Sequence, residues 1–183
     1  MKILPLISPA RQQRAGVSLL ETLIAISVGM MAMAAVGSMT LFTARSFVAS
    51  GNYADLDRAS FVALDTLSRD IRQSRALTLP FTTNKLTLTD NDNVTLTYEY
   101  KPSTSEFTRV KNGTTTVLLK QCDFLNFAIY QRTPTNGWNW RPVTTSLISE
   151  AKLIDVSWKC SRKILGAKVN TESVQTAKVV VRN

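Results

Sequence analysis

The first hydrophobic pattern along the chain is continuous. Residues 17–44 contain one charged side chain, Glu21, and no proline. Coiled as an α-helix, such a segment is about 40 Å long, whereas the hydrocarbon core of a bilayer is about 30 Å thick. Cations flank it on both sides, at Lys2, Arg11, Arg14 and Arg45. The pattern predicts a single membrane-spanning helix over 17–44 with a cytoplasmic N-terminus, because short basic segments stay inside.

The second pattern is amphipathic. Residues 45–79 are polar, but apolar side chains recur at spacings of three and four, at Tyr53, Leu56, Leu64, Leu67 and Ile71. This spacing places them on one face of a helix. No proline separates this stretch from the apolar run, and Pro80 is the first residue that cannot continue a helix. The sequence therefore predicts one long helix, apolar over 17–44 and amphipathic over 45–79.

The third pattern has a period of two. Over 80–183, short alternating segments are separated by turn residues such as Asn112-Gly113. Predicted strands cover 85–89, 94–100, 107–110, 116–119, 124–130, 152–158 and 174–181. Short strands joined by tight turns indicate an antiparallel sheet. The fold class is predicted to be α+β, with the sheet covering the apolar stripe of the amphipathic helix.

The residues at the start of the apolar run carry more information than a plain anchor would. A basic leader ends at Gly16, the apolar run begins at Val17, and a carboxylate follows at Glu21. This arrangement resembles the prepilin signal of type IV pilins and type II secretion pseudopilins. The resemblance implies that a prepilin peptidase removes the leader 1–16 and N-methylates Val17. Val17 stands where the family usually has Phe, and Ser18-Leu19-Leu20 stands where it commonly has Thr-Leu-Ile.

The resemblance also implies a role for Glu21 in assembly. A carboxylate inside a bilayer costs about 2.5 kcal/mol or more, so it should have a partner. In a filament of this family the partner would be the N-terminal ammonium of Val17 in a neighbouring subunit. Such a buried pair would set the axial register of the subunits. The alternative is that Glu21 lies at a helix end and reaches toward the lipid headgroups.

The predicted architecture as a whole looks like the pilin fold. Three segments are similar to minor subunits of the PilW and pseudopilin J kind: Leu67–Ser74, Leu86–Tyr100 and Thr176–Asn183. The resemblance implies a minor pilin or pseudopilin in the bacterial inner membrane, with its C-terminal region periplasmic or extracellular. It would assemble into, or prime, a type IV pilus or a type II secretion pseudopilus. The implied partners are other pilin subunits, prepilin peptidase, the inner-membrane assembly platform and membrane lipid.

Two other interpretations of the N-terminus are open. An ordinary secretory signal peptide would be cut after Ala32-Met33-Ala34, which fits the small-x-small pattern. An uncleaved anchor would leave Met1 in place. Either would make the protein an exported β-sheet binding domain, secreted or membrane-anchored. The mature N-terminus distinguishes them, because Val17, Ala35 and Met1 are three different answers.

Composition narrows the chemistry. The chain has no histidine, which removes imidazole acid–base catalysis and most zinc sites. No carboxylates are paired by the sequence and no glycine-rich phosphate loop is present, so we expect no enzyme activity, no metal and no cofactor. The formal charge is +9, and most of it lies in residues 78–183, where it is spread singly along the segment. A nucleic-acid partner is therefore not favoured, although the charge does not exclude one.

Three smaller features carry hypotheses. Cys122 and Cys160 form an even pair in a segment predicted to be exported, which favours a disulfide over two separate buried thiols. Trp138 and Trp140 lie between two arginines. The loop that carries them would bind a partner subunit or a nucleic-acid strand, or it would be a long hairpin whose indoles pack on the sheet. The hairpin is the favoured interpretation.

The run Asp90–Asn93 is predicted to be a hairpin turn rather than a calcium loop, because it lacks the glycine and glutamate of an EF-hand.

Overall fold

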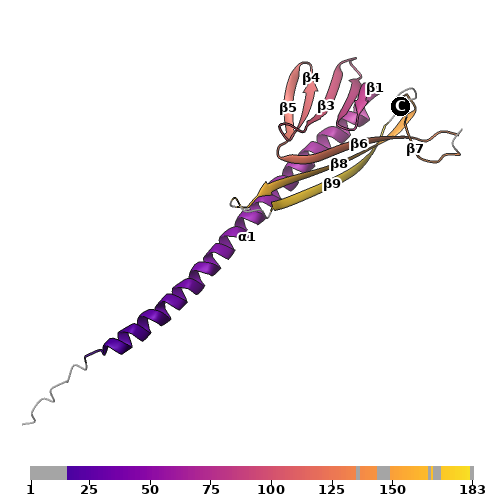
Figure 1. Cartoon of the computed structure of the whole chain (residues 1–183). Coiled ribbons are helices and arrows are strands. Elements are labelled where there is room, and N and C mark those ends of the chain that lie inside the picture. The colour runs from indigo at the N-terminus through magenta and orange to yellow at the C-terminus, as the bar shows by residue number, and fades with distance from the viewer. Residues whose placement is uncertain (1–15, 135–136, 144–148, 165, 167–169, 182–183) are drawn as a thin grey trace, which may run out of the picture. The chain divides into compact units, whose positions relative to one another are not determined.

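The computed structural model describes residues 16–134, 137–143, 149–164, 166 and 170–181. One helix, α1 (Leu19–Gln73), is followed by strands, and the protein is therefore of the α+β class (Figure 1). The strands are β1 (Ser74–Thr82), β2 (Lys85–Asp90), β3 (Thr95–Lys101), β4 (Glu106–Lys111), β5 (Thr114–Leu119), β6 (Cys122–Gln131), β7 (Arg141–Pro142), β8 (Ala151–Lys163) and β9 (Asn170–Val180). The chain divides into two units, Met1–Ala44 and Arg45–Asn183.

The first unit contains the apolar part of α1. Ser18 caps the helix: its Oγ accepts the Glu21 N–H at 3.2 Å and its carbonyl accepts the Thr22 N–H at 3.1 Å. Side-chain hydroxyls further along donate to carbonyls three or four residues back, at Thr22, Ser27, Ser38, Thr40 and Thr43. These hydroxyls are thus satisfied by the helix itself, as a nonpolar environment requires.

The helix ends at Gln73, earlier than the predicted end at residue 79. The Ser74 hydroxyl donates to the Ile71 carbonyl at 2.7 Å, and β1 begins at Ser74. Strand β1 pairs with β2, and Leu77 is buried there. The prediction relied on Pro80 as the first helix breaker. The helical apolar stripe already stops at Ile71, however, and beyond it the backbone finds hydrogen-bond partners in β2.

The strands form two antiparallel sheets rather than one. The first sheet has the order β1-β2-β3-β4-β5, and the second has the order β7-β6-β8-β9 (Figure 1). All seven predicted strand segments are confirmed, and β1 and β7 are additional. The predicted turn at Asn112-Gly113 joins β4 to β5. Both residues have positive φ, 51° and 75°, which is the conformation that two-residue hairpins favour.

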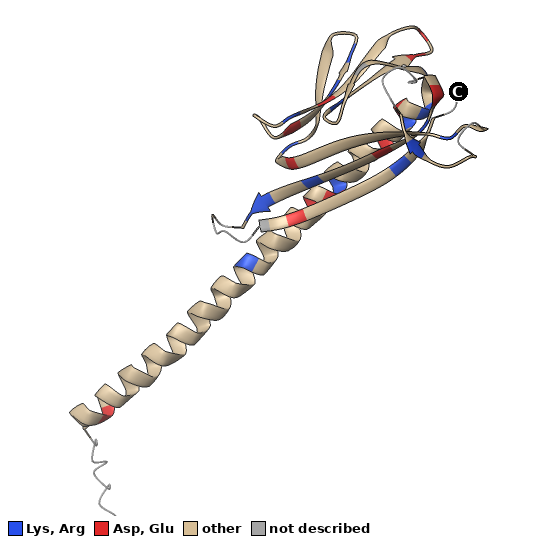
Figure 2. Cartoon of the chain, turned by 45° about the vertical axis from the view of Figure 1, so that its right-hand side comes forward, with Lys and Arg blue, Asp and Glu red and all other residues tan. Residues whose placement is uncertain are grey.

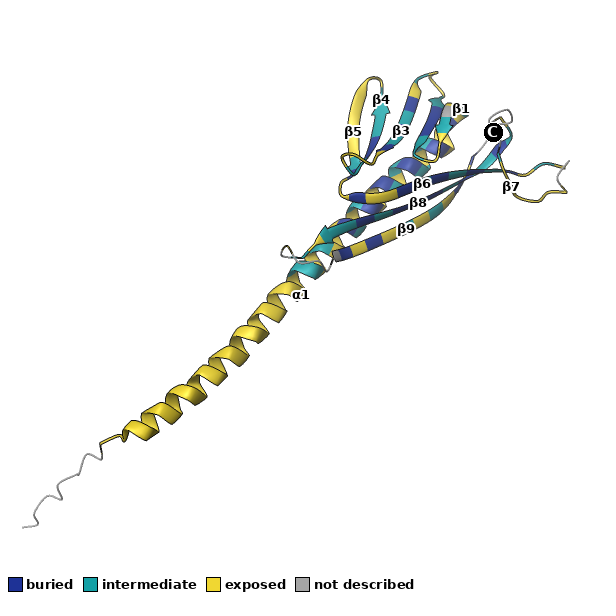
Figure 3. Ribbon diagram, viewed as in Figure 1, coloured by how far each residue is buried: buried dark blue, intermediate teal, exposed yellow. Residues whose placement is uncertain are grey.

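The core of the second unit lies between the amphipathic part of α1 and the sheets. Four helix residues of the predicted stripe or beside it are fully buried: Leu56, Ala63, Leu67 and Ile71. Tyr53, which the spacing placed on the same stripe, is 47% exposed. Phe107 joins the two sheets, because its ring centroid is 5.8 Å from that of Tyr98 and 6.2 Å from that of Trp158. Figure 3 shows buried positions alternating with exposed ones along the strands.

Candidate functional site

The predicted processing site lies immediately before α1. Gly16 and Val17 are exposed and outside regular secondary structure, and no other atom lies within 4 Å of the position that a Gly16 Cβ would take. A backbone in this state is accessible to a peptidase. The leader that would be removed lies outside the described residues, apart from Gly16 itself.

Glu21 occupies the third position of the helix, three residues after the cap Ser18. Its carboxylate is therefore at the positive end of the helix dipole, and the pattern Ser-x-x-Glu is that of a capping box. Within the part of the chain that the structure describes, the carboxylate makes no ion pair. None of these residues therefore neutralises its negative charge.

The apolar part of α1 offers a large unpartnered surface. Every residue from Gly16 to Phe47 is exposed, and α1 is long and apolar enough to cross a membrane. Figure 2 shows the stretch without charged residues between Glu21 and Arg45, and Figure 3 shows its uniform exposure. A surface of this kind in water would be an aggregation site, so it requires lipid or other apolar helices around it.

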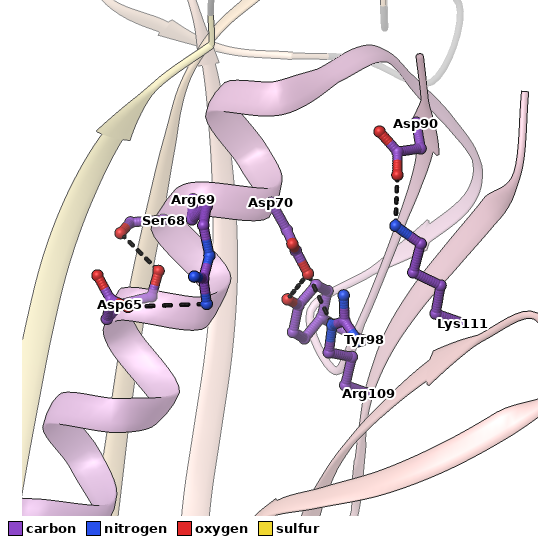
Figure 4. Close-up of polar contacts among 8 residues, drawn as sticks. All are labelled: Asp65, Ser68, Arg69, Asp70, Asp90, Tyr98, Arg109 and Lys111. Carbon is purple, nitrogen blue, oxygen red and sulfur yellow. Dashed lines mark hydrogen bonds and ion pairs between the residues drawn. The ribbon is translucent and has the colours of Figure 1, made fainter. Parts of the chain in front are cut away.

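A polar cluster that the sequence did not predict joins α1 to the first sheet (Figure 4). The Tyr98 hydroxyl and the Arg109 Nε both donate to Asp70 Oδ2, at 2.6 and 2.7 Å. Burial, followed by the hydrogen bond to Asp70, raises the pKa of Tyr98, and the same carboxylate raises the pKa of Arg109. The only available signal was the position of Asp70 beside Ile71 in the buried stripe, and it did not indicate which strand would supply the partners.

Different residues join α1 to the second sheet. The Trp158 Nε1 donates to Ser60 Oγ at 3.2 Å, and the Ser173 hydroxyl donates to Asp57 at 2.9 Å. Arg162 forms an ion pair with Asp55 at 3.0 Å. The amphipathic part of α1 is therefore held to both sheets by side-chain hydrogen bonds as well as by apolar packing.

Cys122 and Cys160 are direct partners across β6 and β8, and both are buried. The Cys122 N–H donates to Ser105 O, and the Ser161 N–H donates to Gln121 O. The two cysteines therefore occupy a non-hydrogen-bonded position, where opposite Cα atoms are closest, about 4.5 Å apart. Disulfides need Cα separations of about 4.4–6.8 Å. The thiols are free in the structure, and the disulfide stays a prediction that this register favours.

The tryptophan loop is a hairpin, as favoured, because β7 pairs with β6. The indoles were expected to pack on the sheet, but both are largely exposed: Trp138 is 58% exposed and Trp140 is 47% exposed. The Arg132 Nε donates to the Trp138 carbonyl at 2.7 Å, and the Arg132 guanidinium carbon lies 5.6 Å from the centroid of Trp140. The arginine that the sequence grouped with these indoles is thus used to hold the loop.

The run Asp90–Asn93 forms the turn between β2 and β3, where the Asn93 N–H donates to the Asp90 carbonyl at 3.0 Å. The Asp90 carboxylate accepts a hydrogen bond from Lys111, which lowers the pKa of Asp90 (Figure 4). Among the described residues, no group of three or more carboxylates and thiols is placed to hold a metal ion.

Comparison with protein-family models, with curated proteins and with solved structures gives no match to this chain. The function is therefore inferred from the residues and their geometry.

Proposed function

We propose that the protein is a minor pilin or pseudopilin, processed by prepilin peptidase, that assembles into or primes a type IV pilus or a type II secretion pseudopilus. One observation supports this most directly: the exposed Gly16–Val17 junction lies four residues before a carboxylate that has no ion-pair partner among the described residues. Cutting that junction creates an ammonium group, which is the partner the carboxylate requires.

The helix supports a filament subunit over a plain anchor. An anchor needs an apolar surface, and an uncharged glutamine would complete the capping box equally well. The charge of Glu21, which costs about 2.5 kcal/mol or more inside a bilayer, therefore has no use in a plain anchor. In a bundle of such helices, the apolar surface is covered by neighbouring subunits and the carboxylate lies among ammonium groups. The ion pair with an ammonium then offsets the cost of burying the carboxylate, and it sets the axial register of the subunits.

The secretory-signal alternative fits the structure less well. A cut before Ala35 would fall inside α1 and leave residues 35–44 as an apolar, fully exposed end of the mature helix. An exported domain with an ordinary signal sequence would gain nothing from such an end. The minor-subunit assignment follows the resemblance of the helix and strand segments to that kind of subunit.

The mature N-terminus tests the proposal. The chromosomal protein is purified from membranes, and its N-terminal peptide is sequenced by mass spectrometry in strains with and without prepilin peptidase. We expect N-methylated Val17 in the first strain and the uncut leader in the second. Ala35 or Met1 as the first residue in the peptidase-positive strain would overturn the proposal.

A pair of matched variants makes the test specific. Gly16→Leu places a bulky side chain at the cut and should leave the leader attached. Gly37→Leu makes the same substitution further along the same apolar helix, where an added Cβ also meets open space. It should be processed normally, which shows that the effect belongs to the junction and not to helix insertion.

A further inference from the structure

The outer face of the second sheet carries a cleft beside the tryptophan loop. It is lined by Tyr130, Trp140, Leu153, Asp155 and Lys178. Tyr130, Leu153, Asp155 and Lys178 alternate along β6, β8 and β9 with core residues such as Ile129 and Ile154, so they lie on the face away from the core. All five lining residues belong to the second unit of the chain.

The cleft combines apolar walls with two free charges. Tyr130 and Leu153 are direct partners across β6 and β8, and Asp155 and Lys178 are direct partners across β8 and β9. Within the described residues, neither the Asp155 carboxylate nor the Lys178 ammonium makes a hydrogen bond or an ion pair. A neighbouring carboxylate and ammonium that are not paired to each other are available to a ligand that both donates and accepts hydrogen bonds.

The aromatic wall is held in place before any ligand arrives. Arg132 bonds to the Trp138 carbonyl and its guanidinium lies beside the ring of Trp140, which lines the cleft together with Tyr130 and Leu153. An aromatic ring fixed in this way loses little side-chain entropy on binding, which is the condition for an effective contact.

We propose that this cleft binds a neutral saccharide, with a sugar ring against the Trp140 indole and adjacent hydroxyls on Asp155 and Lys178. Each sugar hydroxyl both donates and accepts, so a pair of neighbouring hydroxyls satisfies a carboxylate and an ammonium side by side. The C–H face of the ring is apolar and fits against the aromatic wall. The inference goes beyond the proposed assembly function and does not depend on it.

Two other ligand classes fit the cleft less well. An extended peptide adds to a sheet through free backbone groups at an edge, and the edge strand beside the cleft is β9, which contributes only Lys178 to the lining. A nucleic-acid strand would bring phosphates next to Asp155, and it would compete for Arg132, which is already bonded to the loop. A saccharide uses the walls and both charges without either conflict.

The test is a titration of the full-length protein in phosphocholine detergent micelles, which contain no sugar. Glucose, galactose, mannose and N-acetylglucosamine are each added while tryptophan fluorescence is recorded. At least one of them should give a saturating change. The absence of saturation by all four, up to the solubility limit, would overturn the proposal. Saturation by oligothymidylate without any response to the sugars would also overturn it, in favour of a nucleic-acid site.

Variants locate the binding. Trp140→Ala should lower the affinity for the sugar by at least about tenfold, as expected for a central aromatic contact. Trp138→Ala removes the neighbouring exposed indole, which does not line the cleft, and keeps the carbonyl that Arg132 uses. The affinity of this variant for the sugar should match that of the unmodified protein. Asp155→Asn, a surface change that leaves the fold intact, should weaken binding by about threefold to tenfold. Equal losses in the two tryptophan variants, or none in Asp155→Asn, would overturn the assignment of the site.

Discussion

The two halves of α1 are one helix with two different kinds of surface. From Leu19 to Ala44 every residue is exposed, and the hydroxyl side chains bond back to the helix. From Arg45 to Gln73 one face is buried, and the polar side chains on or beside that face bond to strands. The apolar face of the second half is therefore covered by strands of its own chain, whereas the apolar surface of the first half has no cover among the described residues.

This difference separates assembly from folding. Hydroxyls such as Ser27 and Thr40 need nothing beyond the helix, which suits a nonpolar environment. Ser60 and Asp70 need Trp158 and Tyr98, which suits a packed domain. Under the proposed function, substitutions in the first half should affect assembly and leave the domain intact, whereas substitutions in the second half should affect the stability of the domain.

The largest expected effect is at Glu21. Glu21→Val should be processed and inserted normally, but piliation or secretion by a strain with this chromosomal copy should be lost. The reason is that the ammonium of the neighbouring subunit loses its partner. Pilus counts or secreted-protein assays measure this, and the unfolding of the domain serves as a control that should not change.

Glu21→Gln separates the two roles of this residue. Glutamine at the third helix position still supports the capping box with Ser18, but it carries no charge. If assembly depends on the charge, Glu21→Gln should fail as completely as Glu21→Val. Normal assembly with glutamine would show that Glu21 serves only to begin the helix.

The next largest effect concerns the cysteine pair. A Cys122–Cys160 disulfide, formed when an exported thiol oxidase accepts two electrons, should stabilise the domain by about 3–4 kcal/mol. Denaturant unfolding of the full chain, followed by tryptophan fluorescence, should therefore shift to lower denaturant after reduction. Non-reducing peptide mapping establishes the bond itself. Two free thiols in protein isolated without reductant would contradict the prediction.

Asp70→Ala should cost about 3 kcal/mol of unfolding free energy. It leaves the buried Tyr98 hydroxyl and the largely buried Arg109 guanidinium without their acceptor. Asp65→Ala is the matched control, because it removes a carboxylate from the same helix whose partner Arg69 is 57% exposed. The control should change stability by less than about 0.5 kcal/mol. Similar losses in both variants would refute the importance of the cluster.

A smaller effect is expected at Ser60. Ser60→Ala leaves the indole N–H of Trp158 buried without an acceptor, at a cost of about 1–2 kcal/mol in the same unfolding measurement. Ser68→Ala provides the comparison, since that hydroxyl only bonds to the carbonyl of Asp65 in its own helix. It should be close to neutral.

The smallest effect is the dependence on acid pH at Asp90. Lys111 lowers the pKa of Asp90 below its usual 3.8, so the charged form is favoured by folding. The contribution of this ion pair to stability is fully present above the usual pKa of Asp90, and it is lost as the pH falls through the lower pKa of the folded state. Lys111→Met should flatten this part of the stability curve between neutral and strongly acidic pH. An unchanged curve would mean that other carboxylates account for it.

Much of the local structure was determined by the sequence itself. Three local patterns located the helix and seven strands. They are the continuous apolar run from Val17, the apolar stripe at spacings of three and four, and the alternation with turn residues after Pro80. The cap at Ser18 and the junction at Gly16 are local as well, because each depends on residues within a few positions. Such features are decided by the helix or strand period and by neighbouring backbone groups.

Only the tertiary structure decided which elements meet. The sequence did not reveal that the strands divide into two sheets, that Asp70 receives Tyr98 and Arg109, or that the cleft collects residues from β6, β8 and β9. It also misplaced the end of α1, since Leu77 is buried in a strand paired with β2 rather than in a helix. The reason is that strand pairing and buried hydrogen bonds join residues far apart in the chain, and no local period records which partner satisfies them.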